Sequence, residues 1–558
     1  MRGKVSHAIA PHAYHAATMQ TVFDLLIIGG GINGAGIARD AAGRGLSVAL
    51  CEQGDLAGAT SSASSKLIHG GLRYLETGEF HLVHESLAER ATLLRIAPHL
   101  MRPTRFVIPH TPQLRPAWMI RLGLTFYDLL GGRPCTSCGR LCTSCGRLCT
   151  SCGRLCTSCG RLCTSCGRLC TSCGRRSLPA SQTIRDLTTS AYGSALQAGY
   201  RTGFVYSDVQ TDDARLVILN LRDAAEHGAS ILPRTRLTSA RREGDIWCAT
   251  LLDTTTGRTQ DYRARALINA AGPWVASVFD RLPASQQKHG IRLVKGSHIV
   301  VPRLYAGDHA YTLQHTDRRV IFLLPWEENF TLIGTTDIEL NNPAEPPKIS
   351  AEEIAYLCAA VNRYTKKQIQ PGDAVWQFSG VRALFDDGKD NASAVTRDYR
   401  LQLDDAAGKA PLLSVFGGKL TTYRRLAERA MEKLQPWLFA SGRPWTANTA
   451  LPGGDYPLAE TISQLQTSHP NLPPAWLEQL ARRHGSRALL LLADVREPKD
   501  LGLDFGGSLY EIEVAHFLAH EWAHEADDIL WRRTKTGLHM TPEQRAQFAD
   551  WLVSRNAH

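Results

Sequence analysis

The stretch from Thr21 to Asp55 constrains the fold of this chain more than any other. It reads TVFDLLIIGGGINGAGIARDAAGRGLSVALCEQGD, an apolar run that ends in glycines, an alanine-rich segment with helical spacing, and a second apolar run that ends at Glu52. This order predicts a strand, a glycine turn, a helix and a second strand followed by an acidic residue. We therefore expect a Rossmann-like α/β domain that begins near residue 21.

Three glycines of this stretch fit the dinucleotide-binding pattern G-x-G-x-x-G. Gly29 allows the tight turn, Gly31 lets the backbone approach a pyrophosphate, and Gly34 lets the helix pack on the strand. Glu52 lies 23 residues after Gly29, where a carboxylate binds an adenosine ribose and disfavours a 2′-phosphate. FAD or NAD therefore suits the site better than NADP. Glycine turns also occur for structural reasons, but here the strand, the helix and the acid agree.

Length and charge limit the function classes. A chain of 558 residues predicts two to four domains. The sequence contains no run of 18 apolar residues, so any membrane contact is expected to be peripheral. The net charge of +10 includes six arginines of a short repeat, which leaves the rest only mildly basic and predicts no nucleic-acid partner.

The repeat is CTSCGRL, with five full copies and a truncated sixth between residues 135 and 175. It holds twelve of the 15 cysteines, in spacings that can bind zinc or an iron–sulfur cluster. Identical copies favour a tandem duplication instead, because a folded site needs different neighbours for each ligand. We expect a disordered insert without a metal. The other three cysteines are scattered, which is typical of a reduced, intracellular protein. Residues 1–20 are expected to be a disordered tail.

Three later segments are expected to complete the site begun by the glycine turn. The first, SSASSKLIHGGLRY, offers small donors and close backbone approach, although a flexible loop is the alternative. The second is a strand that ends at ALINAAGPW, and the third, SVFGGKLTTYRRLA, repeats the order strand, glycines, helix. The cofactor-binding residues expected here are Ser62, Ser64, Ser65, Lys66, Leu67, His69, Gly272, Gly417, Gly418, Leu420 and Thr421.

Other segments predict the remaining architecture. Residues 291–340 are rich in strands and indicate an antiparallel substrate domain, while residues 447–558 look helical. Residues 115–132 suit an interfacial membrane helix, but a helix packed on the core is the commoner explanation. The sequence His520-Glu521-Trp522-Ala523-His524 matches the zinc motif H-E-x-x-H, with His516 one turn earlier. It lacks the further ligand pattern of metzincins, and a chance match is the simpler interpretation.

Three blocks together, IGGGINGAGIARDAAGRG, SSASSKLIHGGLRYLE and GGKLTTYRRLA, resemble the FAD-dependent respiratory glycerol-3-phosphate dehydrogenase family. The likeness runs from about residue 23 to the C-terminus, interrupted by the repeat. No EF-hand loop follows at the C-terminus, so the chain is similar to the bacterial form. The resemblance implies an amine-oxidase-like FAD-binding domain interleaved with an antiparallel β substrate domain over residues 21–446, and an α-helical C-terminal cap over residues 447–558.

The same resemblance implies the reaction and its setting. Members oxidise sn-glycerol 3-phosphate to dihydroxyacetone phosphate, pass the hydride to FAD, and send electrons to ubiquinone or menaquinone. The expected location is the cytoplasm and the cytoplasmic face of the inner membrane, and a homodimer is allowed. Two alternatives stay open. Another FAD enzyme of this fold, acting on an amine or a hydroxy acid, would form hydrogen peroxide, and a metal or redox protein would use the cysteine array.

Site residues are carried over by position. Arg73 and Arg382 match substrate-binding arginines, as a phosphate dianion requires, and Lys419 matches a lysine near substrate and flavin. His298 is the first candidate for the base that removes the C2 hydroxyl proton, and Lys419 is the second. An ordinary strand histidine is an equally good interpretation of His298. Thr335 is expected to line the same pocket, and the helix after Gly418 to stabilise charge on the reduced flavin.

Overall fold

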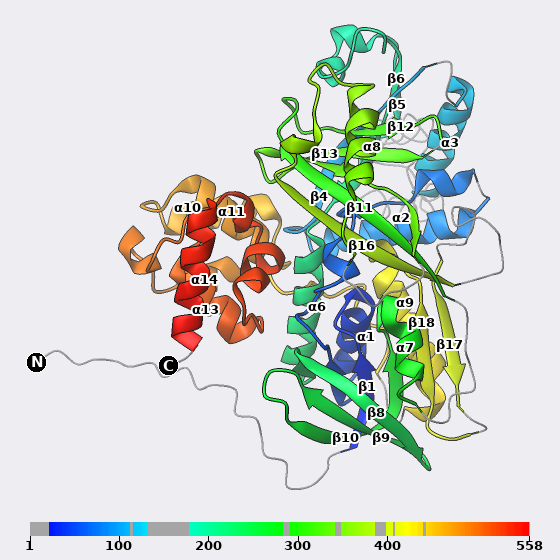
Figure 1. Ribbon diagram of the computed structural model, residues 1–558, viewed down its shortest axis with the longest axis vertical. Coiled ribbons are helices and arrows are strands. Elements are labelled where there is room, and N and C mark those ends of the chain that lie inside the picture. The colour runs from blue at the N-terminus through cyan, green and yellow to red at the C-terminus, as the bar shows by residue number, and fades with distance from the viewer. Residues whose placement is uncertain are drawn as a thin grey trace, which may run out of the picture.

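The computed structural model describes residues 22–76, 78–111, 115–131, 178–282, 291–317, 319–340, 347–385, 398–405, 408–438 and 442–556. The expected N-terminal tail and the whole cysteine repeat, residues 135–175, lie outside these residues. The described chain forms two sheets and a helical C-terminal domain, which lies beside the long helix α6 (Asp213–Glu226) in Figure 1. The part of the chain that is described contains no helix long and apolar enough to cross a membrane.

The first sheet carries the glycine turn. Its strand order is β17-β18-β10-β1-β2-β7, and β8 and β9 continue from β10 as an antiparallel meander. The pairs of β1 with β10, β1 with β2, β10 with β18 and β2 with β7 are parallel. The strands are β1 (Val22–Ile28), β2 (Val48–Cys51), β7 (Ser230–Leu232), β8 (Thr235–Glu243), β9 (Ile246–Asp253), β10 (Thr259–Asn269), β17 (Arg400–Asp404) and β18 (Leu412–Phe416).

Both faces of this sheet are covered, which explains why β1 is apolar throughout. Leu25 and Ile27 belong to a core shared with α6 and with the helices α1 (Ile32–Gly43) and α9 (Tyr423–Leu434). Leu26 and Ile28 point to the opposite face, where they pack with the β8–β9 meander. A strand buried on both faces reads as a continuous apolar run, as this one does. The short helix α7 (Val275–Phe279) follows β10.

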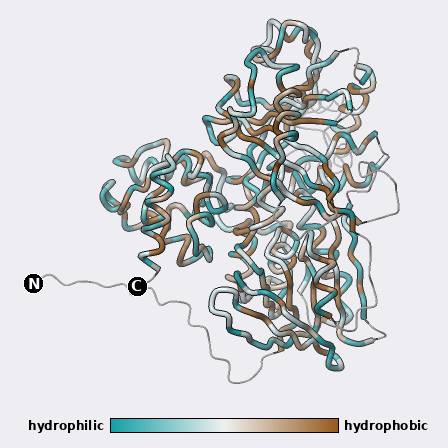
Figure 2. The backbone as a smooth tube through the Cα atoms, in the orientation of Figure 1, coloured by the Kyte–Doolittle hydropathy of each residue, from teal (hydrophilic) through white to brown (hydrophobic). Residues whose placement is uncertain are grey.

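The second sheet has the order β15-β11-β14-β13-β12-β4-β6-β3, with β16 paired to β11 and β5 to β6. Its pairs are antiparallel except for β12 with β4, so the antiparallel expectation holds with one parallel pair. Figure 2 shows hydrophobic segments gathered along it. Its strands are β3 (Leu67–Ile68), β4 (Arg102–Pro109), β5 (Gln182–Ile184), β6 (Gly203–Gln210), β11 (Ile291–Pro302), β12 (Ala310–Gln314), β13 (Val320–Trp326), β14 (Phe330–Gly334), β15 (Ile338–Leu340) and β16 (Trp376–Phe385).

Helices cover the second sheet on both sides. Helix α8 (Ala351–Asn362) packs on one face, where it contacts the side chains of Ile299 and Val301. Helices α2 (Phe80–Ile96) and α3 (Ala117–Leu130) share a core with Val300 on the opposite face. His298 has the same strand parity as Val300 and therefore points away from α8. This parity directs His298 towards the space between the two sheets.

The C-terminal domain is helical and has its own two apolar clusters. Its helices are α10 (Leu458–Ser468), α11 (Pro474–His484), α12 (Arg487–Leu491), α13 (Glu511–His520), a π-helical turn η10 (Asp528–Arg533) and α14 (Pro542–Asn556). The helical character predicted for this region is therefore present. The boundary drawn after residue 446 stays a prediction.

Candidate active site

The turn after β1 depends on glycine at two positions. Gly29 has a φ of +113°, in the left-handed region that side chains rarely adopt. A Cβ atom on Gly34 would lie 2.0 Å from the Gly29 carbonyl oxygen, so this helix residue must also be glycine. Gly31 is the N-cap of α1 and lines a cavity in front of the helix. The helix N-terminus, which favours an anion, thus opens on that cavity.

Glu52 stands at the end of β2 and is fixed by the same turn. Its carboxylate accepts hydrogen bonds from the backbone N–H groups of Gly30, at 2.7 Å, and Gly54, at 3.0 Å. Burial raises the pKa of Glu52, while these two donors lower it. The carboxyl group is held in one place against the glycine turn. It can accept a hydrogen bond from a ribose hydroxyl there, whereas a 2′-phosphate would meet a negative charge.

A cavity of about 570 Å³ runs from this turn to the second sheet. It brings together most of the residues that the sequence singled out. The predicted residues that line it are Gly29, Gly31, Glu52, Ser64, Ser65, Leu67, His69, Gly272, His298, Thr335, Arg382, Gly417, Gly418, Lys419, Leu420 and Thr421. Four predicted residues are described but are not among its lining, namely Gly34, Ser62, Lys66 and Arg73.

Lys66 supports the cavity wall from behind. Its side chain is buried, and its ammonium donates to Asp213 Oδ1 at 2.8 Å and to the Ser62 carbonyl at 2.9 Å. Asp213, the first residue of α6, also accepts from the Ser64 hydroxyl at 2.7 Å. Lys66 and Ser62 thus help to hold this loop and are not among the lining of the cavity, and their contact with the cofactor stays a prediction. A buried lysine needs its counter-charge, and Asp213 supplies it.

His298 lies between this loop and β16. Its side chain is 2% exposed, its Nε2 is 2.9 Å from the Ser65 hydroxyl, and its ring stacks on Phe378 with a centroid separation of 4.9 Å. Burial holds the pKa of His298 well below its usual range, and the positive charges of Arg382 and Lys66 lower it further. The imidazole is therefore neutral near pH 7. Within the described residues its Nδ1 has no hydrogen-bond partner.

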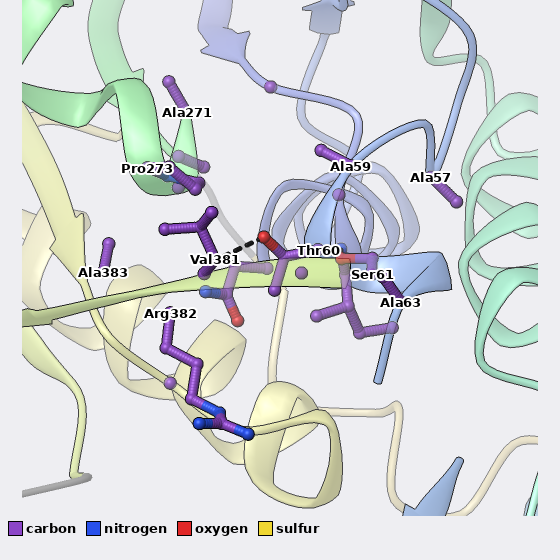
Figure 3. Close-up of a pocket in the computed structure, with 18 of the residues that line it drawn as sticks. Ala57, Ala59, Thr60, Ser61, Ala63, Ala271, Pro273, Val381, Arg382 and Ala383 are labelled. Carbon is purple, nitrogen blue, oxygen red and sulfur yellow. Dashed lines mark hydrogen bonds between the residues drawn. The ribbon is translucent and has the colours of Figure 1, made fainter. Parts of the chain in front are cut away.

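Two cations, Arg382 and Lys419, line the same cavity as the histidine. Arg382 projects from β16 on the side opposite Ala271 and Pro273, as Figure 3 shows, and it forms an ion pair with Asp337. Its second terminal nitrogen is 3.4 Å from the Thr335 hydroxyl. The Lys419 ammonium lies 3.6 Å from the ring centre of Tyr74, which is the neighbour of Arg73. Arg73 thus lies one residue from the cavity lining.

The loop after β18 closes the site against the first glycine turn. Gly417 and Gly418 have φ values of +70° and +98°. The Asn33 side-chain amide of α1 donates to the Gly417 carbonyl at 3.2 Å, and the His69 N–H donates to the Thr421 hydroxyl at 3.2 Å. These contacts join segments that lie more than 350 residues apart in the sequence. The second glycine turn therefore faces the same cavity as the first.

The H-E-x-x-H motif does not form a helical zinc site. Helix α13 ends at His520, and Trp522 has a φ of +55°, so His520 and His524 are not one turn apart on a helix. The Glu521 carboxylate is instead bound by both terminal nitrogens of Arg215. One ligand atom from each of His484, His516 and Glu521 lies within 4.8 Å of the others. The Arg215 guanidinium, however, holds the carboxylate that a metal would need.

Sequence reasoning missed several residues of the site. Tyr74 is next to Arg73 and Asp337 is two positions after Thr335, so both could have been found by reading one or two positions further. Asn33 lies inside the glycine pattern, and Asp213 is the first residue of helix α6. Arg532 of the C-terminal domain also lines the cavity. It lies more than 470 residues from the glycine turn, so no local signal could have found it.

Comparison with known proteins agrees with this architecture. Residues 24–424 match the sequence model of the FAD dependent oxidoreductase family, and residues 444–549 match that of the C-terminal domain of alpha-glycerophosphate oxidase. The chain is 47% identical to the aerobic glycerol-3-phosphate dehydrogenase of Escherichia coli (strain K12), over 95% of this chain and 97% of that one. The chain belongs to the FAD-dependent glycerol-3-phosphate dehydrogenase family. The predicted family, fold class and cofactor, FAD, are confirmed.

Two further relatives and one solved structure are also similar to this chain. The glycerol-3-phosphate dehydrogenase of Pseudomonas aeruginosa is 48% identical, over 97% of each chain. The D-erythritol 1-phosphate dehydrogenase of Brucella abortus is 47% identical, over 96% of this chain and 98% of the relative. The structure of glycerol-3-phosphate dehydrogenase from Bacillus halodurans complexed with FAD has a TM-score of 0.67 at 22% identity, covering 96% of this chain and 94% of that one. That structure shares the fold.

The residues present fit FAD. A side chain on Gly34 or Gly29 would strike backbone, so these positions keep the helix N-terminus open to a phosphate. Glu52 suits the adenosine ribose. The same cavity is lined by the turn at Gly417 and by His298, so it extends from the glycine pattern to residues of both sheets. An NAD half-site would not require this second glycine turn.

Proposed function

We propose that this protein oxidises sn-glycerol 3-phosphate to dihydroxyacetone phosphate and passes the electrons to a membrane quinone. The observation that carries this proposal is the cavity itself, which the buried His298 and the cations Arg382 and Lys419 line together. A phosphate dianion needs such cations, and oxidation of a secondary alcohol needs a proton acceptor near its hydroxyl. Bound FAD supplies the acceptor for the hydride that leaves C2.

The protein's own residues perform the remaining tasks. Arg382 binds the phosphate with Arg73, while Asp337 and Thr335 hold the Arg382 guanidinium in place. His298 accepts the C2 hydroxyl proton on a ring nitrogen. The ring is neutral beforehand because burial and the positive charges of Arg382 and Lys66 lower its pKa. Lys419 stays the second candidate for this base. The N-terminal end of the segment after Gly418 stabilises negative charge at the flavin end of the cavity.

A direct experiment tests the reaction. The purified protein should show a bound-flavin absorbance spectrum, and anaerobic addition of sn-glycerol 3-phosphate should bleach it. A flavin that stays oxidised with this substrate would contradict the proposal. Glycerol without phosphate serves as the control and should leave the flavin oxidised.

A second substrate has a specific argument in its favour. A D-erythritol 1-phosphate dehydrogenase is as similar to this chain as the glycerol-3-phosphate dehydrogenases are. Both substrates carry a phosphate, so the phosphate-binding cations do not discriminate between them. Rapid mixing of each substrate with the oxidised protein distinguishes the two. The true substrate should give the larger ratio of flavin-reduction rate to apparent dissociation constant.

Helix α3 supports the proposed contact with the inner membrane. Trp118 is 69% exposed, and Leu122, Phe126 and Leu129 are exposed with it at helical spacing. Such an apolar face beside arginines is typical of an interfacial helix. The double variant Trp118→Ser and Phe126→Ser should bind less to anionic lipid vesicles in a sedimentation assay. Leu490→Ser is the matched control, because Leu490 is 76% exposed but lies on the C-terminal domain.

The quinone and the oligomeric state belong to the same proposal. Reduction of ubiquinone or menaquinone by the substrate-reduced protein, followed by absorbance, identifies the acceptor. Equal reduction of oxygen, with hydrogen peroxide as product, would favour an oxidase instead. Light scattering in mild detergent gives the molar mass that decides whether the protein is a homodimer.

A further inference from the structure

The C-terminal domain meets the FAD-binding domain through the π-helical turn η10. Its last residue, Arg533, is 0% exposed and binds both carboxylate oxygens of Asp55, at 2.6 and 2.8 Å. Arg532 binds the same carboxylate. Two consecutive arginines of one domain thus hold a single aspartate of the other. π-helical turns are rare and occur often at functional sites.

Asp55 belongs to the wall of the cofactor cavity. It ends the short loop that starts at Glu52, and it lines the cavity together with Arg532. The loop is tied to the glycine turn, since the Gly30 N–H donates to Glu52 and the Ala57 N–H donates to the Gly30 carbonyl. A second cavity of about 350 Å³ is also lined by Asp55 and Arg532, so this pair forms part of the wall between the two.

The two domains also meet beside the catalytic end of the cavity. Trp531 stacks on Trp376 of β16 with a centroid separation of 4.8 Å, and Trp376 lies against Phe378, the ring that stacks on His298. Lys535 donates to Asp212 at 2.9 Å, next to the Asp213 that holds Lys66. The segment 531–535 thus contacts the supports of both ends of the cavity.

Because the ion pair between Asp55 and Arg533 is buried, its loss should change the loop that carries Asp55. Asp55 and Arg533 are both buried, and a buried ion that loses its partner strongly destabilises the conformation that buries it. The loop from Glu52 to Asp55 can therefore keep its present shape only while the arginines are in place. An ion pair at a solvent-exposed rim would have no such effect.

We propose that the C-terminal domain is part of the FAD site, because Arg532 and Arg533 hold the loop that binds the adenosine half of the cofactor. The domain then sets how long FAD stays bound, independently of which phosphorylated alcohol is oxidised. Nothing in the reaction itself requires this role, so the proposal can fail while the proposed function stands.

The test measures FAD release from the holoenzyme. After dilution into buffer, free FAD fluoresces more strongly, and the rise gives the rate of release. The double variant Asp55→Asn and Arg533→Met should release FAD about tenfold faster or more, the size expected for losing a charge-assisted contact. The single variant Asp55→Asn should show the same direction more strongly, because it leaves the Arg533 charge buried without this partner, and the double variant gives the result if the single one fails to fold.

A matched control separates this role from domain docking in general. Arg487 and Glu226 form another two-pronged ion pair between the same domains, at 2.5 and 2.6 Å, but it is partly exposed and neither residue lines the cavity. The double variant Arg487→Met and Glu226→Gln should release FAD at the parent rate. Equal acceleration in both double variants, or none in the Asp55 variants, would overturn the proposal.

Discussion

The two ends of the cofactor cavity are built in different ways. The adenosine end comes mainly from one continuous stretch, Val22 to Asp55, and acts through backbone N–H groups, glycines and one carboxylate. The proposed catalytic end is formed by the side chains of His298, Arg382 and Lys419, which come from separate strands and turns. The first end depends on space for the backbone, and the second on the balance of buried charges. Substitutions at the two ends should therefore fail in different ways.

The largest effect is expected from Gly34→Val at the adenosine end. Even the Cβ atom would lie 2.0 Å from the Gly29 carbonyl oxygen, so the glycine turn must move. The purified variant should contain no FAD, as its visible absorbance will show. Gly199→Ala is the control, because a Cβ atom on Gly199 has no neighbour within 4 Å. A Gly34 variant with full FAD content would contradict the conclusion that the adenosine end depends on space for the backbone.

The next effect is expected from His298→Gln at the catalytic end. Removal of the proton acceptor should lower the rate of flavin reduction by about 10²- to 10⁴-fold, with FAD still bound. In the parent enzyme the low pKa of His298 keeps it neutral, so kcat/KM should stay flat across neutral pH and fall only below the usual histidine range. Stopped-flow reduction over a pH series measures both. Loss of FAD in this variant would show that His298 is structural.

Arg382→Met should affect binding rather than the cofactor. The loss of one charge-assisted phosphate contact should raise KM by about 10- to 100-fold and leave FAD bound. Asp337 would then face the substrate without its partner, which adds to the effect. Arg382→Lys keeps the charge and should recover part of the loss. Steady-state kinetics with varied substrate measure the change, and an unaltered KM would remove Arg382 from the phosphate site.

The smallest effect is expected from the buried pair behind His298. The double variant Lys66→Met and Asp213→Asn removes a positive charge that lowers the pKa of His298 and leaves the charge of Arg382 in place. The pKa should rise, so the acid limb of kcat/KM moves to higher pH. The buried pair Arg39 and Asp223 is the control, and its double neutral variant should leave the limb in place. If the acid limb of kcat/KM moved equally in both double variants, the result would contradict this account.

Most residues that the sequence singled out for the two ends line one cavity, and their roles there stay predictions. Gly29, Gly34 and Glu52 carry a fixed spacing because strand, turn and helix are neighbours along the chain. Lys66 shows where such reading stops. It lies in a motif that faces the cofactor, yet its partner Asp213 lies 147 residues away and turns it to the rear of the loop. The H-E-x-x-H match likewise depends on distant residues, since the helix ends at His520 and Arg215 binds Glu521.

The contact between Asp55 and Arg533 also sets the earliest time during synthesis at which the loop at Asp55 can take its final shape. The two residues are 478 positions apart, so at 5 to 20 residues per second roughly 25 to 100 s pass between their appearance on the ribosome. Throughout that interval the glycine turn exists without the arginines that hold its neighbouring loop. A prematurely terminated polypeptide would carry the whole nucleotide-binding sequence and still lack this contact. The residues around Arg533, which are translated late, thereby decide whether the loop at Asp55 holds its final shape.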